Sequence, residues 1–308
     1  MKKTKVLVTG GAGFIGSHLT NRLTDEGYRV TVVDSLVKGK LENINRKINF
    51  LKLDITSEKF GHEVKKLKPQ IIFHFAAQSS IKRSFESPLK DLQINLLATQ
   101  SLLDLAKDLS LEKIIFASSA AVYRPTQKLP IKEEDSKEPI SLYGLSKLCS
   151  EYLLKNYYPA HNLPYITLRF SNVYGEKQDT SGEGGVVAIF IDKILKGQQC
   201  IIFGDGSQTR DFIHVSDVID TCILSLKRST VGEFNISTAK ETSVLSLYKN
   251  LLKLLGTKEK KLLKKHNYLE SKRSSLSYQK FAKLTHWKPK VDLNAGLEDT
   301  SRYFKGLL

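Results

Sequence analysis

Short runs of β-branched and aromatic residues alternate with longer stretches of helical periodicity through the first half of the chain. This alternation is typical of βαβ units, in which helices join parallel strands and cover the sheet. The pattern predicts an α/β fold, with one long helix at 87–109 where leucines recur at helical spacing. Strands are predicted at 5–10, 29–34, 48–54, 71–77, 113–119 and 165–175.

The alternation loosens after Gly175, where glycine-rich stretches such as "SGEGG" and "FGDGSQ" enter the sequence. We therefore expect a main domain over residues 1–175 and a smaller, discontinuous α/β lobe over 176–308. "FIHVSDVID" and "GEFNIST" have the pattern of elements that return to the sheet. A return segment of about 212–238 is accordingly assigned to the main domain.

The composition is that of a soluble globular protein, with 308 residues, 41% of them hydrophobic and 26% charged. Its three cysteines, Cys149, Cys200 and Cys222, lie far apart and form no CxxC motif. This disfavours a disulfide framework or a metal site and favours a reducing compartment. The apolar run near the start is too short for a signal peptide, and no run approaches a membrane span. We expect a cytoplasmic protein without membrane association.

The formal net charge of +16 is compatible with an enzyme for anionic substrates and with a nucleic-acid binder. Between Thr257 and Lys290, eleven lysines and arginines face two acids. This region has no zinc-finger or helix-turn-helix pattern, and "LYKNLLKLLG" reads as a helix with a solvated basic end. Nucleic acid is therefore disfavoured as a partner.

A glycine-rich segment, "VTGGAGFIGSHL", stands between the first predicted strand and the first helix. Its glycines permit a tight turn that brings the backbone and the helix N-terminus close to a pyrophosphate. Asp34 ends the next strand, about twenty residues on, where it can accept hydrogen bonds from an adenosine ribose. Ser35 follows it, with no arginine for a 2′-phosphate, so NAD is preferred over NADP. These features predict a Rossmann-type, doubly wound parallel sheet; the loop residues are Gly10, Gly11, Gly13, Phe14, Ile15 and Gly16.

A second pattern, "SLYGLSKLCSEYLLKNYY", places Tyr143 four residues ahead of Lys147 on an amphipathic helix. Residues four apart share a helix face, so the phenol and the ammonium lie side by side. The spacing arises often by chance and does not by itself separate a catalytic pair from a solvated one.

Taken together, the motifs resemble those of the extended short-chain dehydrogenase/reductase superfamily, and within it the NAD-dependent nucleotide-sugar epimerases. The resemblance covers essentially the whole chain. It rests on "TGGAGFIG", "VVDSL", "FHFAAQ", "SSAAVY", "YGLSK", "RFSNVYG" and "FGDGSQTRDFIHVSDV".

The resemblance implies a catalytic triad of Ser119, Tyr143 and Lys147. Tyrosine is a weak acid with a free pKa of about 10, and a nearby ammonium and a positive nicotinamide favour its phenolate. Tyr143 would then remove the proton of the sugar 4-hydroxyl while hydride leaves C4 for NAD. Ser119 would hold the O4 oxygen, and Lys147 would also position the nicotinamide ribose.

The resemblance further implies groups of cofactor and substrate contacts. Besides the loop, Tyr143 and Lys147, the cofactor contacts are Asp34, Ser35, Asp54, Ile55, Phe75, Ala76, Ala77, Asn95, Ser118 and Phe170. Asp54 reads equally well as a cap at the end of its strand. The implied substrate contacts are Ser79, Ser119, Asn172, Val187, Phe203, Arg210, Arg273 and Ser274. Among these, Arg210 matches phosphate geometry best, and its alternative is a salt bridge with Asp205 or Asp211.

The chain departs from the family pattern in two places. Arg124 stands where a glycine usually follows "VY", and Asn267–Glu270 aligns with a stretch whose arginine pins the diphosphate. Arg273, Lys272 and His266 are candidates to supply the missing charge. In this register Ser274 occupies the position that gates the 2-substituent of the sugar, where a tyrosine restricts the pocket. A serine there predicts acceptance of N-acetyl sugars as well.

The implied activity is a UDP-hexose 4-epimerase reaction that interconverts UDP-glucose and UDP-galactose through a 4-keto intermediate with tightly bound NAD. Ala120 and Ala121 replace the Asp-Glu pair of the related 4,6-dehydratases, which disfavours dehydration. A reductase of nucleotide-4-ketosugars that uses a dissociable NAD(P)H stays open, as does a dinucleotide-sensing scaffold. The resemblance also implies a homodimer that pairs through helices at about 91–108 and 142–156. Leucines with the spacing for that face or for the intramolecular core are Leu92, Leu96, Leu103, Leu148 and Leu153.

Overall fold

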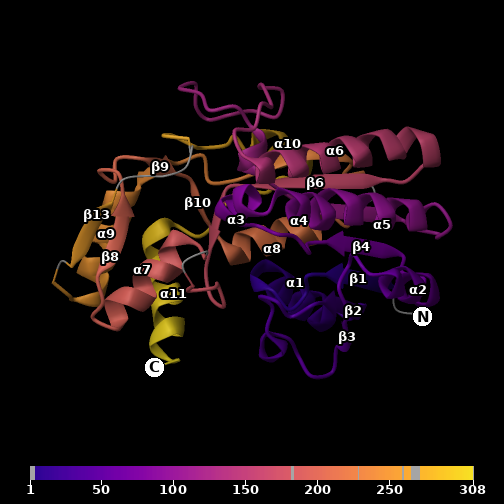
Figure 1. Ribbon diagram of the computed structural model, residues 1–308, viewed down its shortest axis with the longest axis horizontal. Helices are drawn as coiled ribbons and strands as arrows, with labels where there is room; N and C mark the ends of the chain where they lie inside the picture. Colours follow the sequence, from indigo (N-terminus) through magenta and orange to yellow (C-terminus); the bar gives the residue numbers. More distant parts are fainter. Residues whose placement is uncertain (1–3, 182–183, 228, 259, 265–270, 308) are drawn as a thin grey trace. The chain divides into compact units, whose positions relative to one another are not determined.

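The structure, a computed structural model, describes residues 4–181, 184–227, 229–258, 260–264 and 271–307. The chain forms two compact units, and Figure 1 labels most of their helices and strands. Unit 1 comprises Met1–Tyr123, Lys137–Arg169 and Ile219–Phe234, and unit 2 comprises Arg124–Ser136, Phe170–Val218 and Asn235–Leu308. Each unit therefore contains segments that lie far apart in the sequence.

Unit 1 is built on a seven-stranded sheet with the strand order β11-β6-β5-β4-β1-β2-β3. Strand β1 pairs in parallel with both β2 and β4, and β2–β3 and β4–β5 are parallel as well. This order, which reverses direction between β1 and β4, confirms the Rossmann-type α/β fold that the sequence predicts. The strands are β1 (Lys5–Thr9), β2 (Arg29–Asp34), β3 (Asn49–Lys52), β4 (Ile71–His74), β5 (Lys113–Ser119), β6 (Tyr165–Phe170) and β11 (Gly232–Ile236).

Helices and short turns connect these strands. The α-helices are α1 (Phe14–Asp25), α2 (Glu58–Leu67), α3 (Ile81–Glu86), α4 (Pro88–Leu92), α5 (Ala98–Ala106), α6 (Leu142–His161) and α8 (Val215–Leu224). Two 3-10 turns, η1 (Leu41–Asn43) and η3 (Ala120–Val122), and one π-helical turn, η2 (Gln93–Leu97), complete the set.

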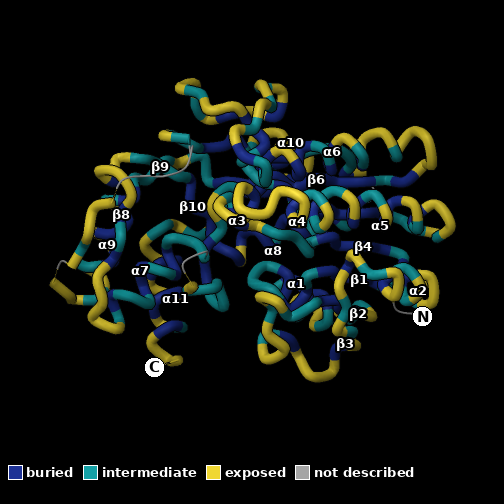
Figure 2. The backbone as a smooth tube through the Cα atoms, viewed as in Figure 1, coloured by how far each residue is buried: buried dark blue, intermediate teal, exposed yellow. Residues whose placement is uncertain are grey.

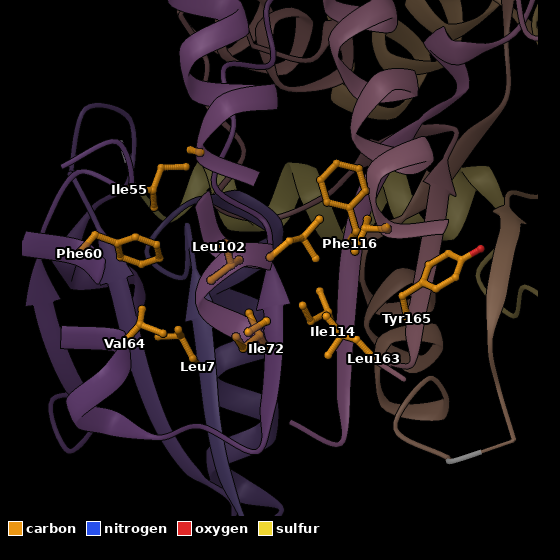
Figure 3. Close-up of a cluster of buried hydrophobic side chains, with 14 of the residues drawn as sticks. Leu7, Ile55, Phe60, Val64, Ile72, Leu102, Ile114, Phe116, Leu163 and Tyr165 are labelled. Carbon is orange, nitrogen blue, oxygen red and sulfur yellow. The ribbon is translucent and has the colours of Figure 1, made fainter. Parts of the chain in front are cut away.

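One hydrophobic core of unit 1 forms where α2, α5 and α6 pack on a face of the sheet. Figure 3 shows Phe60 and Val64 of α2 and Leu102 of α5 turned toward the side chains of the strands. The central strands are buried along most of their length (Figure 2), which explains their continuous β-branched runs. At about 25 cal/mol per Å² of apolar area, such burial is the main stabilising contribution to the unit.

The structure corrects the expected single helix at 87–109. It is divided into α4, the π-helical turn η2 and α5. Asn95 lies inside the turn, and its backbone carbonyl accepts hydrogen bonds from Thr99 Oγ1 at 2.7 Å and Ser150 Oγ at 2.8 Å. Side-chain hydroxyls thus donate to a carbonyl in the widened turn. Local periodicity in the sequence cannot predict such a turn.

A buried ammonium joins the start of β5 to the segment that follows α8. Lys113 is 3% exposed, and its Nζ donates to the carbonyls of Ser225, Lys227 and Thr230. These carbonyls lie at and just beyond the C-terminal end of α8, where a cation is favourable. The contact binds residues more than one hundred positions apart within unit 1.

Unit 2 has three two-stranded sheets, β10-β7, β12-β9 and β13-β8. Its core gathers Val187, Phe190 and Ile191 of α7 with Leu247, Tyr248 and Leu251 of α9. The strands are β7 (Asn172–Tyr174), β8 (Cys200–Phe203), β9 (Thr209–Arg210), β10 (Phe212–His214), β12 (Thr242–Ser243) and β13 (Lys261–Lys264). The helices are α7 (Val186–Leu195), α9 (Val244–Leu255), α10 (Gln279–Thr285) and α11 (Leu293–Lys305).

One sequence expectation about strands is wrong. The predicted strand at 165–175 is interrupted at Ser171, so β6 ends at Phe170 and β7 pairs with β10 in unit 2. The segment "FIHVSDVID" supplies Phe212–His214 as β10 and then the start of α8. "GEFNIST" returns to the large sheet as β11, at the edge beside β6.

Candidate functional site

The chain turns tightly between β1 and α1, at the point where the strand order reverses. Gly10 has φ +70°, and a Cβ there would lie 2.6 Å from the amide nitrogen of Ala76. A Cβ on Gly16 would lie 2.1 Å from the Gly10 carbonyl oxygen. The N-cap, Gly13, supplies no side-chain cap to α1, so its first N–H groups remain available to an anion. This loop fits a pyrophosphate; Phe14 and Ile15 open the helix beside it.

Asp34 lies at the end of β2, next to the same loop. Its carboxylate accepts hydrogen bonds from the backbone N–H of Ala12 at 3.0 Å and of Leu36 at 2.8 Å. A carboxylate has about four lone-pair positions, so each oxygen can accept one more donor, such as a ribose hydroxyl. A Cβ on Gly39 would lie 2.7 Å from Asp34 Oδ1, so that glycine keeps the carboxylate accessible.

The segment that follows β4 lies against the phosphate loop. Thr9 fixes its start, because the Thr9 hydroxyl accepts from the N–H groups of Phe75 at 3.2 Å and Ala76 at 3.3 Å. Asn95 fixes its continuation: the Asn95 side chain accepts from the Gln78 N–H at 2.9 Å and donates to the Gln78 carbonyl at 3.0 Å. Asn95 thus holds the backbone of this segment, which also contains Ala77.

The predicted triad comes together between the C-terminal end of β5 and the first two turns of α6. Tyr143 shares a side-chain hydrogen bond with Ser119. The Lys147 ammonium donates to the Ala117 carbonyl at 2.8 Å and lies 4.6 Å from the centre of the Phe116 ring. One strand end therefore contacts both ionisable members of the triad.

Burial opposes the charged forms of both groups. It raises the pKa of Tyr143 to about 12, although the hydrogen bond with Ser119 acts in the opposite direction. It also lowers the pKa of Lys147 to about 8, against the raising effect of the Asp91 and Glu151 carboxylates. Perturbed ionisable groups of this kind cluster at functional sites.

Two residues at the start of α6 explain how Tyr143 reaches Ser119. Ser141 caps the helix, since its hydroxyl accepts from the Gly144 N–H at 3.0 Å. A Cβ on Gly144 would lie 2.2 Å from the Ala121 carbonyl oxygen, so only glycine permits this approach. No role for Gly144 is predicted from the sequence, although its place inside "YGLSK" is a usable signal.

A buried ion pair lies behind the triad. Glu151 and Arg169 form a bidentate pair, with Nη2–Oε2 at 2.6 Å and Nε–Oε1 at 3.0 Å. Ser118 donates to the same carboxylate, and Arg169 Nη1 donates to the Tyr123 hydroxyl at 2.7 Å. Ser118, expected to contact the cofactor, therefore anchors the end of β5 to α6.

Four of the expected substrate residues gather on neighbouring segments of unit 2. The Asn172 N–H donates to the Asp211 carbonyl at 2.9 Å, and Arg210, the last residue of β9, directly precedes Asp211. Arg273 forms a bidentate pair with Glu241, whose carboxylate also accepts from Thr209. Ser274 follows Arg273 directly. The stretch Asn267–Glu270 and His266 lie outside the described residues.

The remaining expected residues have varied surroundings. Asp54 accepts from the N–H and hydroxyl of Thr56, as a turn cap does. Val187 is buried in the core of unit 2, whereas Phe203 on β8 is 47% exposed. Ile55 and Phe170 are buried, Ser35 is half-buried, and Ser79 is exposed.

Neither a metal cluster nor a membrane-spanning helix is found in the part of the chain that the structure describes. It contains no group of three or more His, Cys, Asp or Glu side chains that could hold a metal ion. None of its helices combines the length and the apolar character that crossing a membrane requires.

Comparison with curated proteins finds relatives along nearly the whole chain. A Methanocaldococcus jannaschii protein, provisionally named a UDP-glucose 4-epimerase, is 41% identical over 97% of this chain and 98% of its own length. The UDP-glucose 4-epimerase of Mycolicibacterium smegmatis is 34% identical, with 98% of each chain covered. A dTDP-D-glucose 4,6-dehydratase from Bos taurus is 32% identical over 98% of this chain and 88% of that protein.

Solved structures agree. The UDP-glucose 4-epimerase of Thermotoga maritima with UDP-glucose has a TM-score of 0.95 and 38% identity, covering 99% of each chain. That of Thermus thermophilus with NAD also has a TM-score of 0.95, with 33% identity over 99% of this chain and 100% of that one. The UDP-N-acetylglucosamine 4-epimerase of Methanobrevibacter ruminantium, with UDP-N-acetylmuramic acid, has a TM-score of 0.93 and 33% identity, with both chains fully covered.

A family model agrees with these relatives and with the geometry of the glycine loop, Asp34 and the triad. The model described as "NAD dependent epimerase/dehydratase family" matches residues 6–237, well over half of the sequence. The chain therefore belongs to the NAD-dependent epimerase/dehydratase family, and its cofactor is NAD.

Proposed function

We propose that the protein is a UDP-hexose 4-epimerase that interconverts UDP-glucose and UDP-galactose. The observation that carries the proposal is the hydrogen bond between Tyr143 and Ser119 at the end of β5, with Lys147 one helix turn further on. When a phenol and a hydroxyl are hydrogen-bonded to each other, both can contact the same alcohol oxygen of a sugar. The hydroxyl can then bind that oxygen while the phenol removes its proton. The similarity to UDP-glucose 4-epimerases supports this choice.

In this mechanism Ser119 holds O4 of the hexose by a hydrogen bond, and Tyr143 takes the proton of the 4-hydroxyl as the C4–H bond breaks. NAD, when bound, would accept the hydride from C4, would return it to the opposite face of C4 after the 4-keto sugar has turned over, and would supply a positive charge that favours the phenolate. Tyr143 returns the proton to O4 in that second half of the reaction, so no net oxidation occurs. Lys147 stabilises the phenolate by its charge.

Residues beside the triad argue against dehydration. Ala120 and Ala121 form the turn η3 directly after Ser119, and the Ala121 N–H donates to Ser119 Oγ at 3.2 Å. Alanine has no acid or base with which to remove water across C5 and C6 of a sugar. We therefore propose epimerisation, although a 4,6-dehydratase is among the relatives.

The test is incubation of the purified protein with UDP-galactose. We expect UDP-glucose to form without added cofactor, with NAD retained through purification and no net change in absorbance of reduced nicotinamide. Stoichiometric consumption of NAD(P)H would instead indicate a ketosugar reductase. A 4-keto-6-deoxy product would indicate a dehydratase, and either result would overturn the proposal.

For the nucleotide, we propose that Asn172, Arg210 and Arg273 bind the diphosphate. A guanidinium matches phosphate geometry through two parallel hydrogen bonds. Arg273 already uses Nε and Nη2 on Glu241, and its Nη1 lies 3.5 Å from Gln127 Oε1. The Glu241 carboxylate thereby fixes the direction of the guanidinium, and the Nη1 edge is the one proposed for phosphate.

Substrate breadth gives one prediction. We expect wild-type protein to act on UDP-N-acetylglucosamine as well as UDP-glucose, because Ser274 leaves space for the 2-acetamido group. Ser274→Tyr fills that space with a ring, so kcat/KM for the N-acetylated substrate should fall at least ~100-fold. Activity of the same variant on UDP-galactose serves as the control and should stay within a few-fold. Equal losses on both substrates would contradict the assignment of Ser274.

We also propose a homodimer that pairs through α4–α5 and α6. The structure assigns Leu103 and Leu153 to the intramolecular core, and Leu148 is buried as well. The exposed apolar residues on these helices are instead Leu89 and Leu97, and Leu145 and Tyr152 of α6, each at least 43% exposed. Exposed apolar side chains that gather into one patch are typical of an interface, and we propose that these four do so.

A charge placed on this exposed apolar face should prevent dimer formation. Leu97→Glu introduces a charge that would be buried in the interface, so light scattering at micromolar concentration should show a monomer where wild type shows a dimer. Leu263→Glu is the matched control, because Leu263 is a similarly exposed leucine on β13 of unit 2. A monomeric wild type, or dimers for both variants, would contradict the proposed interface.

A further inference from the structure

The Asp211 carboxylate accepts hydrogen bonds from two distant segments of unit 2. Asp211 is 1% exposed. Its Oδ1 accepts from the N–H of Thr238 at 2.9 Å and the Thr238 hydroxyl at 2.7 Å. Its Oδ2 accepts from the N–H of Ala239 at 3.0 Å, the Ser275 hydroxyl at 3.2 Å and the N–H of Leu276 at 3.4 Å.

These donors come from two segments distant in the sequence, and a third lies close. Residues 238–239 follow β11, and residues 275–276 lie beyond β13. The Ser171 hydroxyl approaches Oδ1 at 3.5 Å, and the backbone of Asp211 receives the N–H of Asn172 at 2.9 Å. One carboxylate thus fixes the mutual positions of three segments within unit 2.

Three of the unit 2 residues proposed to bind the nucleotide sugar each stand beside one of these anchored points. Asn172 follows Ser171, Arg210 precedes Asp211, and Ser274 precedes Ser275. A further backbone hydrogen bond, from the Thr209 N–H to the Lys272 carbonyl at 2.9 Å, joins the strand of Arg210 to the segment of Arg273. The positions of Asn172, Arg210 and Ser274 relative to one another therefore depend on the hydrogen bonds made by Asp211 and by its neighbours in the sequence.

Burial raises the pKa of the Asp211 carboxyl, and the hydrogen bonds from Thr238, Leu276 and Ser275 oppose that shift because they favour the ionised form. All the donors named above are neutral N–H or O–H groups, and hydrogen bonds to an ionised acceptor are stronger than neutral ones. An asparagine would keep one acceptor oxygen and direct an NH₂ group at backbone N–H donors, which cannot accept a hydrogen bond and would be left unpaired. At least one of the two anchored segments must then move.

We propose that Asp211 is a positioning residue for the nucleotide sugar: it sets the geometry of the diphosphate and sugar contacts without touching the substrate. The proposal rests on the proposed function. A change of Asp211 should affect substrate binding. It should leave NAD binding unchanged, because the glycine loop and the triad belong to unit 1. Asp211→Asn should therefore raise the KM for UDP-galactose and the Kd for UDP at least ~10-fold, with NAD content unchanged.

Asp217→Asn is the matched control. Asp217 is a buried carboxylate of the same unit, 1% exposed, and accepts from the N–H groups of Lys290 and Val291. Lys290 and Val291 are not among the proposed substrate residues. Both variants should have a lower melting temperature than wild type. Only Asp211→Asn should bind UDP more weakly, as measured by calorimetry. Equal effects of the two variants on UDP binding, or no effect of either, would overturn the proposal.

A milder variant decides the question if Asp211→Asn does not fold. Ser275→Ala removes a single hydrogen bond to Oδ2 in the segment next to Ser274, and a loss of ~3-fold in UDP affinity is expected. Unchanged UDP affinity in a folded Ser275→Ala protein would then count against Asp211. If wild type itself fails to bind UDP, the proposed function fails, and this outcome is distinct from failure of the Asp211 inference.

Discussion

Tyr143→Phe is expected to lower kcat for UDP-galactose epimerisation by at least ~100-fold, the usual effect of losing a general acid–base group. Phenylalanine preserves the ring and its packing but removes the hydroxyl that shares a hydrogen bond with Ser119. The KM should change little, because the loss concerns a group that acts on the reacting proton. Steady-state kinetics with UDP-galactose measure both parameters.

The control for this variant is Tyr158→Phe, a change of the same kind further along α6. Tyr158 is 37% exposed and has no place in the proposed mechanism, so its activity should match wild type. NAD content should be the same in all three proteins. Turnover of Tyr143→Phe near the wild-type value would sink the mechanism.

Gly16→Ala is expected to remove NAD from the purified protein. The added Cβ would lie 2.1 Å from the Gly10 carbonyl oxygen and 2.9 Å from Gly11 Cα, both backbone atoms that no side-chain rotation can move away. The loop must therefore open, and the N-terminus of α1 loses its place beside the pyrophosphate. We expect NAD affinity to fall about 100-fold, equivalent to ~2.7 kcal/mol. Titration of the cofactor-free protein with NAD measures this loss.

Gly61→Ala, a glycine-to-alanine change in α2, is the control. Its Cβ would make ordinary contacts of 3.6 Å and 3.7 Å with Leu105, so fold and NAD content should remain those of wild type. Bound NAD in Gly16→Ala at the wild-type level would show that the loop accommodates a Cβ, contrary to the geometry described here.

The sheet was largely predictable because its signals are local. The apolar runs at 29–34 and 113–119 coincide with β2 and β5. Continuous β-branched runs mark strands that are covered on both faces. The π-helical turn at Gln93–Leu97 was not predictable, because it depends on hydrogen bonds to Asn95 from Ser150, which lies 55 residues away. The interruption at Ser171 is also a tertiary effect, since Asn172 pairs with Phe212 rather than with the large sheet.

The candidate site also has some residues that local sequence patterns predict and others that they do not. The glycine loop and Asp34 follow from the local requirements of a pyrophosphate and a ribose, whereas the triad came from resemblance to a family. Asp211 was considered only as an ion-pair partner of Arg210. Its actual partners lie 27 to 65 residues away, at Thr238, Ala239, Ser275 and Leu276. A pattern in one segment cannot reveal such a convergence.

The divided construction of unit 1 has a consequence for how the chain folds as it is synthesised. When residue 175 leaves the ribosome, six of the seven strands exist, but the outer edge of β6 has no neighbour until Gly232–Ile236 follows. Lys113 likewise lacks its three carbonyl acceptors until residue 230 has emerged. An unpaired strand edge invites association with other chains. While nearly sixty further residues are synthesised, the nucleotide-binding unit is therefore nearly complete, but the edge of β6 is still unpaired.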